Sequence, residues 1–86
     1  MKFELGRVFA TRAALHDFGP ALIAELLVRH ASGDWGDLSA FDRQQNSWAL
    51  RHRARLLSAY ETPAGRVWII TESDRSSTCV LSPEEY

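Results

Sequence analysis

The sequence has few of the residues that link a chain covalently or bind a metal. It contains one cysteine, Cys79, in 86 residues, so no disulfide can form within the chain and packing must hold the fold together. The three histidines and Cys79 include no pair at the spacing of a zinc site, and we expect neither a metal nor another cofactor. Cys79 stands among apolar residues with no charged neighbour to activate it, which is typical of an inert thiol.

Long apolar runs and a strong excess of one charge are also missing. No segment approaches the roughly 20 apolar residues of a membrane-spanning helix, and the first residues lack the apolar stretch of a signal peptide. We therefore expect a cytoplasmic protein that has no membrane partner. Ten basic and eleven acidic residues give a net charge of −1, so no global field draws the chain to nucleic acid or anionic lipid.

Recognisable catalytic patterns are absent from the sequence as well. It has no Gly-x-Ser-x-Gly segment, no glycine-rich phosphate loop and no paired-carboxylate signature. These observations favour a protein that is not an enzyme. The composition, with 45% hydrophobic and 24% charged residues, is that of a globular chain. A chain of this length forms one domain, so residues 1–86 are taken as a single unit.

Local patterns predict a strand, two or three helices and then three more strands. The expected elements are a strand within residues 3–10 interrupted at Gly6, helices at Arg12–Phe18, from Pro20 to about His30 and at Ala40–His52, and strands at Leu56–Tyr60, Arg66–Thr71 and Thr78–Leu81, followed by a tail at Glu84–Tyr86. Thr11 and Ser39 are suitable N-caps. Short turns make the last three strands antiparallel neighbours. We predict an α+β domain whose C-terminal three-stranded antiparallel meander packs on the helices.

Apolar side chains point to both faces of the predicted sheet. Val67 and Ile69 point one way along their strand, and Trp68 and Ile70 point the other way. Either both faces are covered, or one apolar face is left for a partner. A homodimer that pairs through a sheet face is therefore one of the assemblies to consider.

Two predicted helices carry residues of interest. The helical period places Phe41, Gln45, Trp48 and His52 along one face of the third helix. His30 ends the apolar stripe of the second helix, where it can also complement the C-terminal end of the helix dipole. A structural histidine is the favoured interpretation of His30.

The turn from Asp34 to Asp37 is the most unusual feature of the sequence. Trp35 stands there between two acids and two glycines, and aromatic residues in such loops often contact partners. In one interpretation Trp35 anchors a partner, with Asp34 and Asp37 beside it. In the other, Trp35 folds back into the core while Asp37 or Ser39 caps the next helix.

The densest basic run contains Arg51, Arg53 and Arg55. If this run is extended, the three side chains share one face at a spacing close to that of neighbouring phosphates on a nucleic-acid strand. If it is helical, only Arg51 and Arg55 align, at a helix C-terminus. A solvated helix end is favoured, and nucleic-acid binding is the alternative.

Several segments together resemble a family of small bacterial proteins associated with plasmids and other mobile elements. They are Gly33–Leu38, Asn46–Leu50, Leu56–Tyr60, Trp68–Glu72, Asp74–Ser76 and Pro83–Tyr86. Members are often labelled as restriction-modification subunits, although this chain is too short for a cofactor-binding methyltransferase domain. Asp74 and Arg75, which lie in one of these segments, are also candidate partner-binding residues. The chain departs from the family pattern at Arg12, Ala13 and Cys79.

The leading hypothesis is a non-enzymatic accessory protein of a mobile element that binds a host protein. Its most specific form is an inhibitor of a host defence complex, of the anti-CRISPR or anti-restriction type, in which the acids around Trp35 mimic nucleic-acid charge. The alternative is a toxin similar to RelE and ParE, because the order of elements resembles theirs. In that case Arg51, Arg53 or Arg55 would hold phosphates and Arg75 or Tyr86 would lie near the chemistry. The low net charge argues against this alternative.

Overall fold

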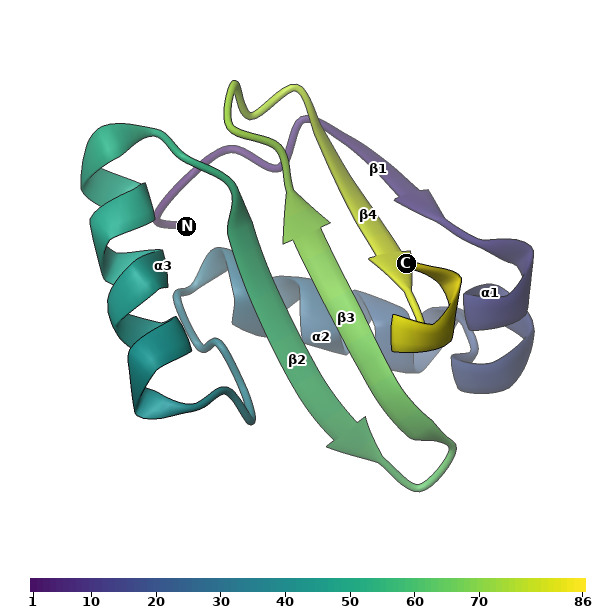
Figure 1. The fold of residues 1–86 in the computed structure, drawn as a ribbon. Helices are drawn as coiled ribbons and strands as arrows, with labels where there is room; N and C mark the ends of the chain where they lie inside the picture. Colours follow the sequence, from purple (N-terminus) through teal and green to yellow (C-terminus); the bar gives the residue numbers. More distant parts are fainter.

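The computed structural model describes residues 1–86 as a small α+β domain (Figure 1). In chain order the elements are β1 (Arg7–Ala10), α1 (Arg12–Phe18), α2 (Pro20–Ala31), α3 (Ala40–His52), β2 (Leu56–Thr62), β3 (Gly65–Thr71), β4 (Ser77–Leu81) and the 3-10 helix η1 (Pro83–Glu85). The predicted fold class is confirmed. The first strand is shorter than predicted because Gly6, with a φ of +65°, breaks the extended backbone, and part of the expected tail forms η1. No helix is both long and apolar enough to cross a bilayer.

The four strands form one sheet in the order β1-β4-β3-β2. β2, β3 and β4 make the predicted antiparallel meander. β1 pairs with β4 in parallel, with Val8 opposite Thr78 and Phe9 opposite Cys79. Figure 1 shows α2 behind the sheet, α1 next to the end of β1, and α3 beside β2. The sheet therefore has two edges, β1 and β2.

The main core lies between α1, α2 and one face of the sheet, which we call the inner face. Its eight buried members are Ala14, Phe18, Ile23, Leu26, Tyr60, Val67, Ile69 and Val80. The strand residues among them lie at alternate positions along their strands, and the helix residues follow the helical period. Each large apolar side chain buried in this way contributes roughly 1.5–3 kcal/mol to folding.

A second, smaller core lies between α3 and β2. It consists of Trp35, Ala49 and Leu56, with Phe3, Leu38, Leu50 and Ala54 packed against it. Ser39 caps α3 as predicted, since its Oγ accepts a 3.1 Å hydrogen bond from the Asp42 N–H.

α3 does not pack through the side that carries its aromatic residues. Its buried residues are Asn46 and Ala49, whereas Phe41, Trp48 and His52 are exposed. Asn46 fixes this orientation, because its side-chain amide donates to the Leu57 carbonyl at 2.5 Å and accepts from the Leu57 N–H at 3.1 Å. Hydrophobic periodicity does not reveal a hydrogen bond between a polar side chain and a strand edge. The pattern therefore did not predict that α3 packs through Asn46 and Ala49.

The turn from Asp34 to Asp37 also bonds to the edge of β2, beyond the point where Asn46 contacts it. The Ala59 N–H donates to the Trp35 carbonyl at 3.1 Å, and the Asp37 N–H donates to the Ala59 carbonyl at 2.6 Å. The Asp37 carboxylate then accepts from the Glu61 N–H at 2.8 Å. Gly36 lies opposite Ala59 as a parallel bridge. The turn thus takes the place of a fifth strand.

The close approach of Gly36 to β2 yields the first prediction. Gly36 has a φ of +76°, and an added Cβ would collide with the Ala59 carbonyl oxygen and the Tyr60 ring. We expect Gly36→Ala to lower the free energy of unfolding by about 4 kcal/mol or more, measured by urea denaturation. Gly19→Ala is the control, because Gly19 also has a positive φ but nothing lies within 4 Å of its added Cβ. It should cost only about 1–2 kcal/mol; equal losses in the two variants would contradict the proposed collision.

Candidate functional site

Trp35 is part of the core and not an exposed anchor. Only 6% of its surface is exposed. Its ring stacks on Phe3, with centroids 6.0 Å apart, and meets the edge of His30 at 5.8 Å. Of the two interpretations of this turn, the one in which Trp35 folds back into the core is confirmed, and the one in which Trp35 is an exposed anchor is wrong. The Ala59 N–H donates to the Trp35 carbonyl and the Ala59 carbonyl accepts from the Asp37 N–H, and these bonds hold the turn with the Trp35 side chain inwards.

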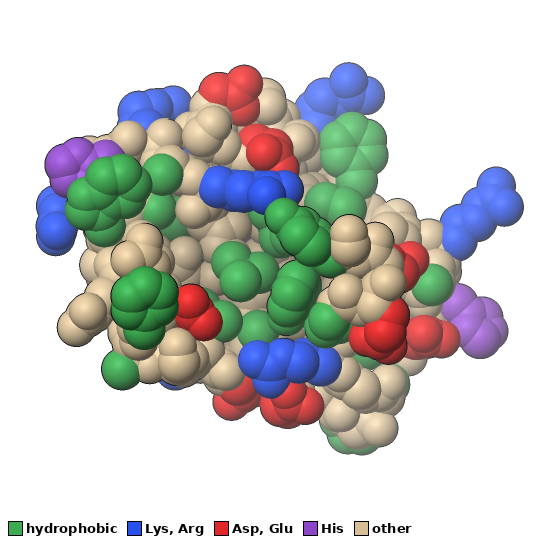
Figure 2. Space-filling view, in the orientation of Figure 1, with side chains coloured by type: hydrophobic (Ala, Val, Ile, Leu, Met, Phe, Trp, Pro, Cys, Tyr) green, Lys and Arg blue, Asp and Glu red, His purple; other side chains and the backbone are tan.

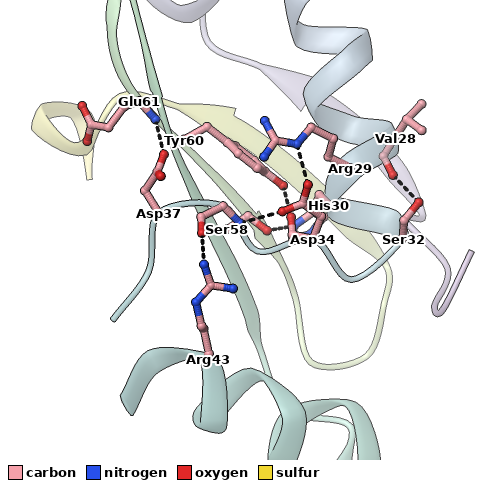
Figure 3. A network of polar contacts seen from close by, with 11 residues as sticks. Val28, Arg29, His30, Ser32, Asp34, Asp37, Arg43, Ser58, Tyr60 and Glu61 are labelled. Carbon is pink, nitrogen blue, oxygen red and sulfur yellow. Dashed lines mark hydrogen bonds and ion pairs between the residues drawn. The ribbon is translucent and has the colours of Figure 1, made fainter. Parts of the chain in front are cut away.

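The two acids beside Trp35 are engaged in bonds that hold the turn (Figure 3). Asp34 accepts from Arg29 Nε at 2.7 Å and from the Gly36 N–H at 3.1 Å, and the bond from Arg29 is the main reason why the pKa of Asp34 lies below its usual value. Asp37 accepts from the backbone of β2. Neither carboxylate is a free mimic of a phosphate, and their contact with a partner stays a prediction.

Arg75 is a structural residue buried under the C-terminal end of α3. Its guanidinium donates to the carbonyls of Ala49, Ala54, Glu72 and Ser73. Carbonyls at a helix C-terminus carry partial negative charge, so a cation is favourable there. Burial lowers the pKa of Arg75. The predictions that Arg75 binds a partner or lies near a reaction are not supported by its position, whereas Asp74 is exposed and its role stays a prediction.

The three arginines of the basic run do not share a face. Arg51 is in the last turn of α3, and Arg53 ends the helix with a φ of +52°. Arg55 lies beyond it, where it forms a 3.4 Å ion pair with Glu72 and donates to the Tyr86 hydroxyl at 2.7 Å. The favoured interpretation, a solvated helix end, is confirmed for Arg51. The extended alternative is wrong, and Arg55 does not align with Arg51 on a helix, because α3 ends at His52 and Arg53 adopts a left-handed conformation.

His30 forms a fully buried polar network that sequence analysis did not find. Its ring lies 2.5 Å from Ser58 Oγ and 2.9 Å from Thr71 Oγ1. Thr71 Oγ1 contacts Thr78 Oγ1 at 2.7 Å, and Thr78 donates to the Leu5 carbonyl. The donor directions then follow: Thr71 donates to Thr78, His30 Nε2–H donates to Thr71, and Ser58 donates to His30 Nδ1. Every group is satisfied with a neutral imidazole.

Burial has a clear electrostatic consequence for this histidine. It lowers the pKa of His30 to about 4, because the low-dielectric surroundings disfavour the charged ring. The interpretation of His30 as a structural histidine is confirmed. A neutral imidazole does not complement the C-terminal end of the helix dipole as a cation would. Since the network is closed to solvent, we assign it to the architecture and not to catalysis.

Two surfaces remain that expose side chains suited to binding. The first is the outer face of α3, defined by Phe41, Gln44, Gln45, Trp48, Arg51 and His52. Phe41 is 67% exposed and Trp48 is 49% exposed, and Trp48 stacks on His52 with ring centroids 4.6 Å apart. Four of the six residues, together with Ser47, line a shallow hollow of about 490 Å³. Figure 2 shows hydrophobic, histidine and basic side chains over α3 at the left of the view.

The second surface is the outer face of the sheet, opposite the main core. Leu57, Trp68 and Ile70 line a hollow of about 250 Å³ there, and Arg55 and Tyr86 border it. The Tyr86 ring meets Trp68 edge-on at 5.5 Å. Figure 2 shows the hydrophobic side chains at the centre of this face between basic groups. The prediction of apolar residues on both faces is confirmed; the C-terminal residue covers part of the outer one.

No catalytic arrangement is evident among the remaining reactive groups. Burial raises the pKa of the Cys79 thiol, which weakens it as a nucleophile. No group of three or more His, Cys, Asp and Glu side chains is placed to hold a metal ion.

Truncation of two tryptophans distinguishes core from surface. We expect Trp35→Ala to lower the free energy of unfolding by about 3–5 kcal/mol, because a buried aromatic leaves a cavity. Trp48→Ala, on the outer face of α3, should lower it by less than about 1 kcal/mol. Urea denaturation followed by circular dichroism measures both. A small loss for Trp35→Ala would show that the ring is not needed in the core.

The buried His30 makes stability depend on pH. In the unfolded chain the imidazole takes up a proton below a pKa of about 6.5, but the folded chain does so only below about 4. The unfolded state therefore binds more protons in this interval, and stability falls as the pH decreases. We expect a loss of about 2 kcal/mol between pH 7 and pH 5.

Two surface histidines provide the controls for this measurement. His16 and His52 are exposed and lie outside the buried network, so His16→Gln and His52→Gln should still lose stability between pH 7 and pH 5, because both variants keep His30. His30→Gln should remove most of the slope, whatever its effect on stability at pH 7. An unchanged slope in His30→Gln would assign the pH dependence to other groups.

No protein family, curated protein or solved structure matches this chain. The resemblance to small proteins of mobile elements therefore stays a prediction.

Proposed function

We propose that this protein acts by binding another protein through the outer face of α3. The observation that carries the proposal is the exposed pair Phe41 and Trp48, seven residues apart on a helix that buries none of its aromatic side chains. Large exposed aromatics of this kind often supply most of the binding energy of an interface. A helix that only covered a sheet edge would need no apolar residues on its solvent side.

The surface is preorganised for binding. Asn46 ties the middle of α3 to the Leu57 backbone, and the Arg75 guanidinium holds its C-terminal end. Ser39 caps its N-terminus. Stacking on His52 restricts the Trp48 ring. Groups already fixed in the free protein lose less entropy on binding, which favours affinity.

Charge indicates the chemistry of the partner. Arg51 and Arg53 take part in none of the ion pairs of the chain, and both are exposed. Arg51 lines the same hollow as Trp48, and Arg53 lies at the C-terminal end of the helix. Unpaired basic groups beside aromatic residues complement an acidic protein surface. The net charge of −1 favours such a partner over nucleic acid, which a protein of this size binds through a wider basic surface.

The partner that we propose is a component of a bacterial defence complex, of the CRISPR or restriction type. The support is the resemblance to small proteins of mobile elements. The mode differs from the charge mimicry expected for the Asp34–Asp37 turn, because those carboxylates bind within the chain and the unpaired charge on the outer face of α3 is that of Arg51. The protein would act by blocking an acidic contact surface of the complex.

The test compares plasmid entry into bacterial strains that each carry one defined CRISPR or restriction system. We expect the wild-type chain to raise plasmid entry in at least one strain and the Phe41→Ala/Trp48→Ala variant to lose this effect. Loss of two such anchors removes at least about 2 kcal/mol, or roughly thirtyfold in affinity. Leu15→Ala/Val28→Ala is the matched control, because Leu15 and Val28 are 49% and 67% exposed on other helices.

Four outcomes would contradict parts of the proposal. Plasmid entry that is unchanged in every strain would remove the defence complex as the partner. Equal loss of effect in the control variant would remove α3 as the binding surface. Growth arrest by the chain, or tight binding of a labelled single-stranded oligonucleotide that depends on Trp48, would instead support the toxin-like alternative.

A further inference from the structure

The two edges of the sheet differ in whether their outward backbone groups are hydrogen-bonded. At the β2 edge, Leu57 and Ala59 have both outward backbone groups bonded by Asn46 and by the Asp34–Asp37 turn. At the β1 edge nothing comparable is present. The backbone groups of Val8 and Ala10 take part in no bond to a loop or cap, and no isolated bridge lies on that side. An edge strand with free N–H and C=O groups can pair with a further strand.

The register of β1 shows which groups are free. The Arg7 N–H donates to the Ser76 carbonyl and the Thr11 N–H to the Val80 carbonyl, so the odd-numbered residues face β4. Val8 and Ala10 must then direct their backbone groups away from the sheet. β1 is exposed along its whole length, and the Phe9 side chain is 48% exposed.

We propose that β1 is a dimerisation edge that pairs antiparallel with β1 of a second copy, around a two-fold axis at Phe9. In this register Phe9 lies opposite Phe9 of the second copy as a non-hydrogen-bonded pair. Val8 lies opposite Ala10 and exchanges both backbone hydrogen bonds with it, on each side of the axis. Two four-stranded sheets become one continuous sheet of eight strands, and neither copy keeps an unpaired edge.

The apolar residues of the outer face favour a second copy over an unrelated strand. Phe9 is in register with Cys79, Cys79 with Ile70, and Ile70 with Leu57. These four side chains form one row across the outer face, ending at the β1 edge. The two-fold axis at Phe9 places two such rows end to end, so that the Phe9 side chains cover one another. Aromatic pairs at such positions stabilise antiparallel strands.

Charge complementarity supports the same register. Arg7 forms no ion pair within the chain, and in the proposed pairing it lies opposite Thr11 of the second copy. Thr11 Oγ1 donates to Glu85 Oε1 at 2.9 Å, so this carboxylate is next to the position that Arg7 approaches. Two arginine–glutamate contacts would form, and no like charges would be directly opposed.

The edge is also held rigid for pairing. Thr78 Oγ1 donates to the Leu5 carbonyl at 2.7 Å just before the strand. The backbone at Gly6 lies so close to Ser76 that no side chain could fit there. Thr11 then caps α1 directly after β1. The strand is therefore fixed at both ends before a second copy binds.

The first test measures the mass of the purified chain by sedimentation equilibrium over a range of concentrations. A four-residue ladder is a small interface, so we expect half-dimerisation on the order of 100 µM. Phe9→Lys places two like charges opposite one another and should weaken the dimer by at least about tenfold. Leu15→Lys is the matched control, because Leu15 is 49% exposed and lies on α1; this variant should dimerise like the wild type.

The second test fixes the register by disulfide cross-linking in a Cys79→Ser background. Phe9→Cys should form a disulfide-linked dimer on mild oxidation, because the two Cβ atoms of such a pair lie about 4.5–5.5 Å apart. Val8→Cys should form much less of the disulfide-linked dimer. In the proposed register Val8 lies opposite Ala10 of the second copy, so the two introduced cysteines are only diagonal neighbours, about 7–8 Å apart. A chain that stays monomeric at about 1 mM, a dimer that survives Phe9→Lys, or stronger linking of Val8→Cys would overturn the proposal. Loss of the dimer in Phe41→Ala/Trp48→Ala would also overturn it by assigning the contact to α3.

Discussion

The neutral imidazole of His30 is the interaction on which the rest of this fold depends. It projects from the last turn of α2 and bonds Ser58 in β2 and Thr71 in β3. Through Thr71 the network continues to Thr78 in β4 and to the Leu5 carbonyl before β1. One side chain thus ties a helix to three strands and to the segment that leads into the fourth. Such a network rigidifies a core only when every member is satisfied, as it is here.

The same histidine sets the position of the segments on the α3 side of the molecule. Phe3 meets its ring edge-on at 5.1 Å, and Trp35 does so at 5.8 Å. Because Trp35 is held against this ring, the turn that carries it lies along β2 and closes that edge. The Asp34–Asp37 turn and Asn46 together close the β2 edge, and the bonds of Asn46 also fix the orientation of α3 against β2. The aromatic side of α3 is left in solvent as a consequence, and the unpaired edge of the sheet is β1.

The two proposed contacts follow from this asymmetry and are independent of one another. The outer face of α3 combines exposed aromatic and basic groups on a rigid helix, which suits an acidic protein surface. The β1 edge offers backbone groups and a row of apolar side chains, which suits another strand. Since α3 lies beside β2 at the opposite edge from β1, a dimer formed through β1 would present two α3 faces to a partner.

The sequence by itself determined the α+β class, the bounds of α1 and α3, and the antiparallel meander, because caps such as Thr11 and Ser39 and alternating apolar residues act over a few residues. It did not determine which side of α3 packs, where Trp35 points or what Arg75 binds. The hydrophobic period of α3 does not predict the bonds between Asn46 and Leu57. A turn with acids around Trp35 is compatible both with an exposed loop and with a tryptophan folded into the core. Those outcomes depend on backbone groups of distant segments that need partners, such as the β2 edge and the C-terminal end of α3. Only the tertiary structure brings these groups together, and it therefore decided which residues hold the fold and which remain free to bind.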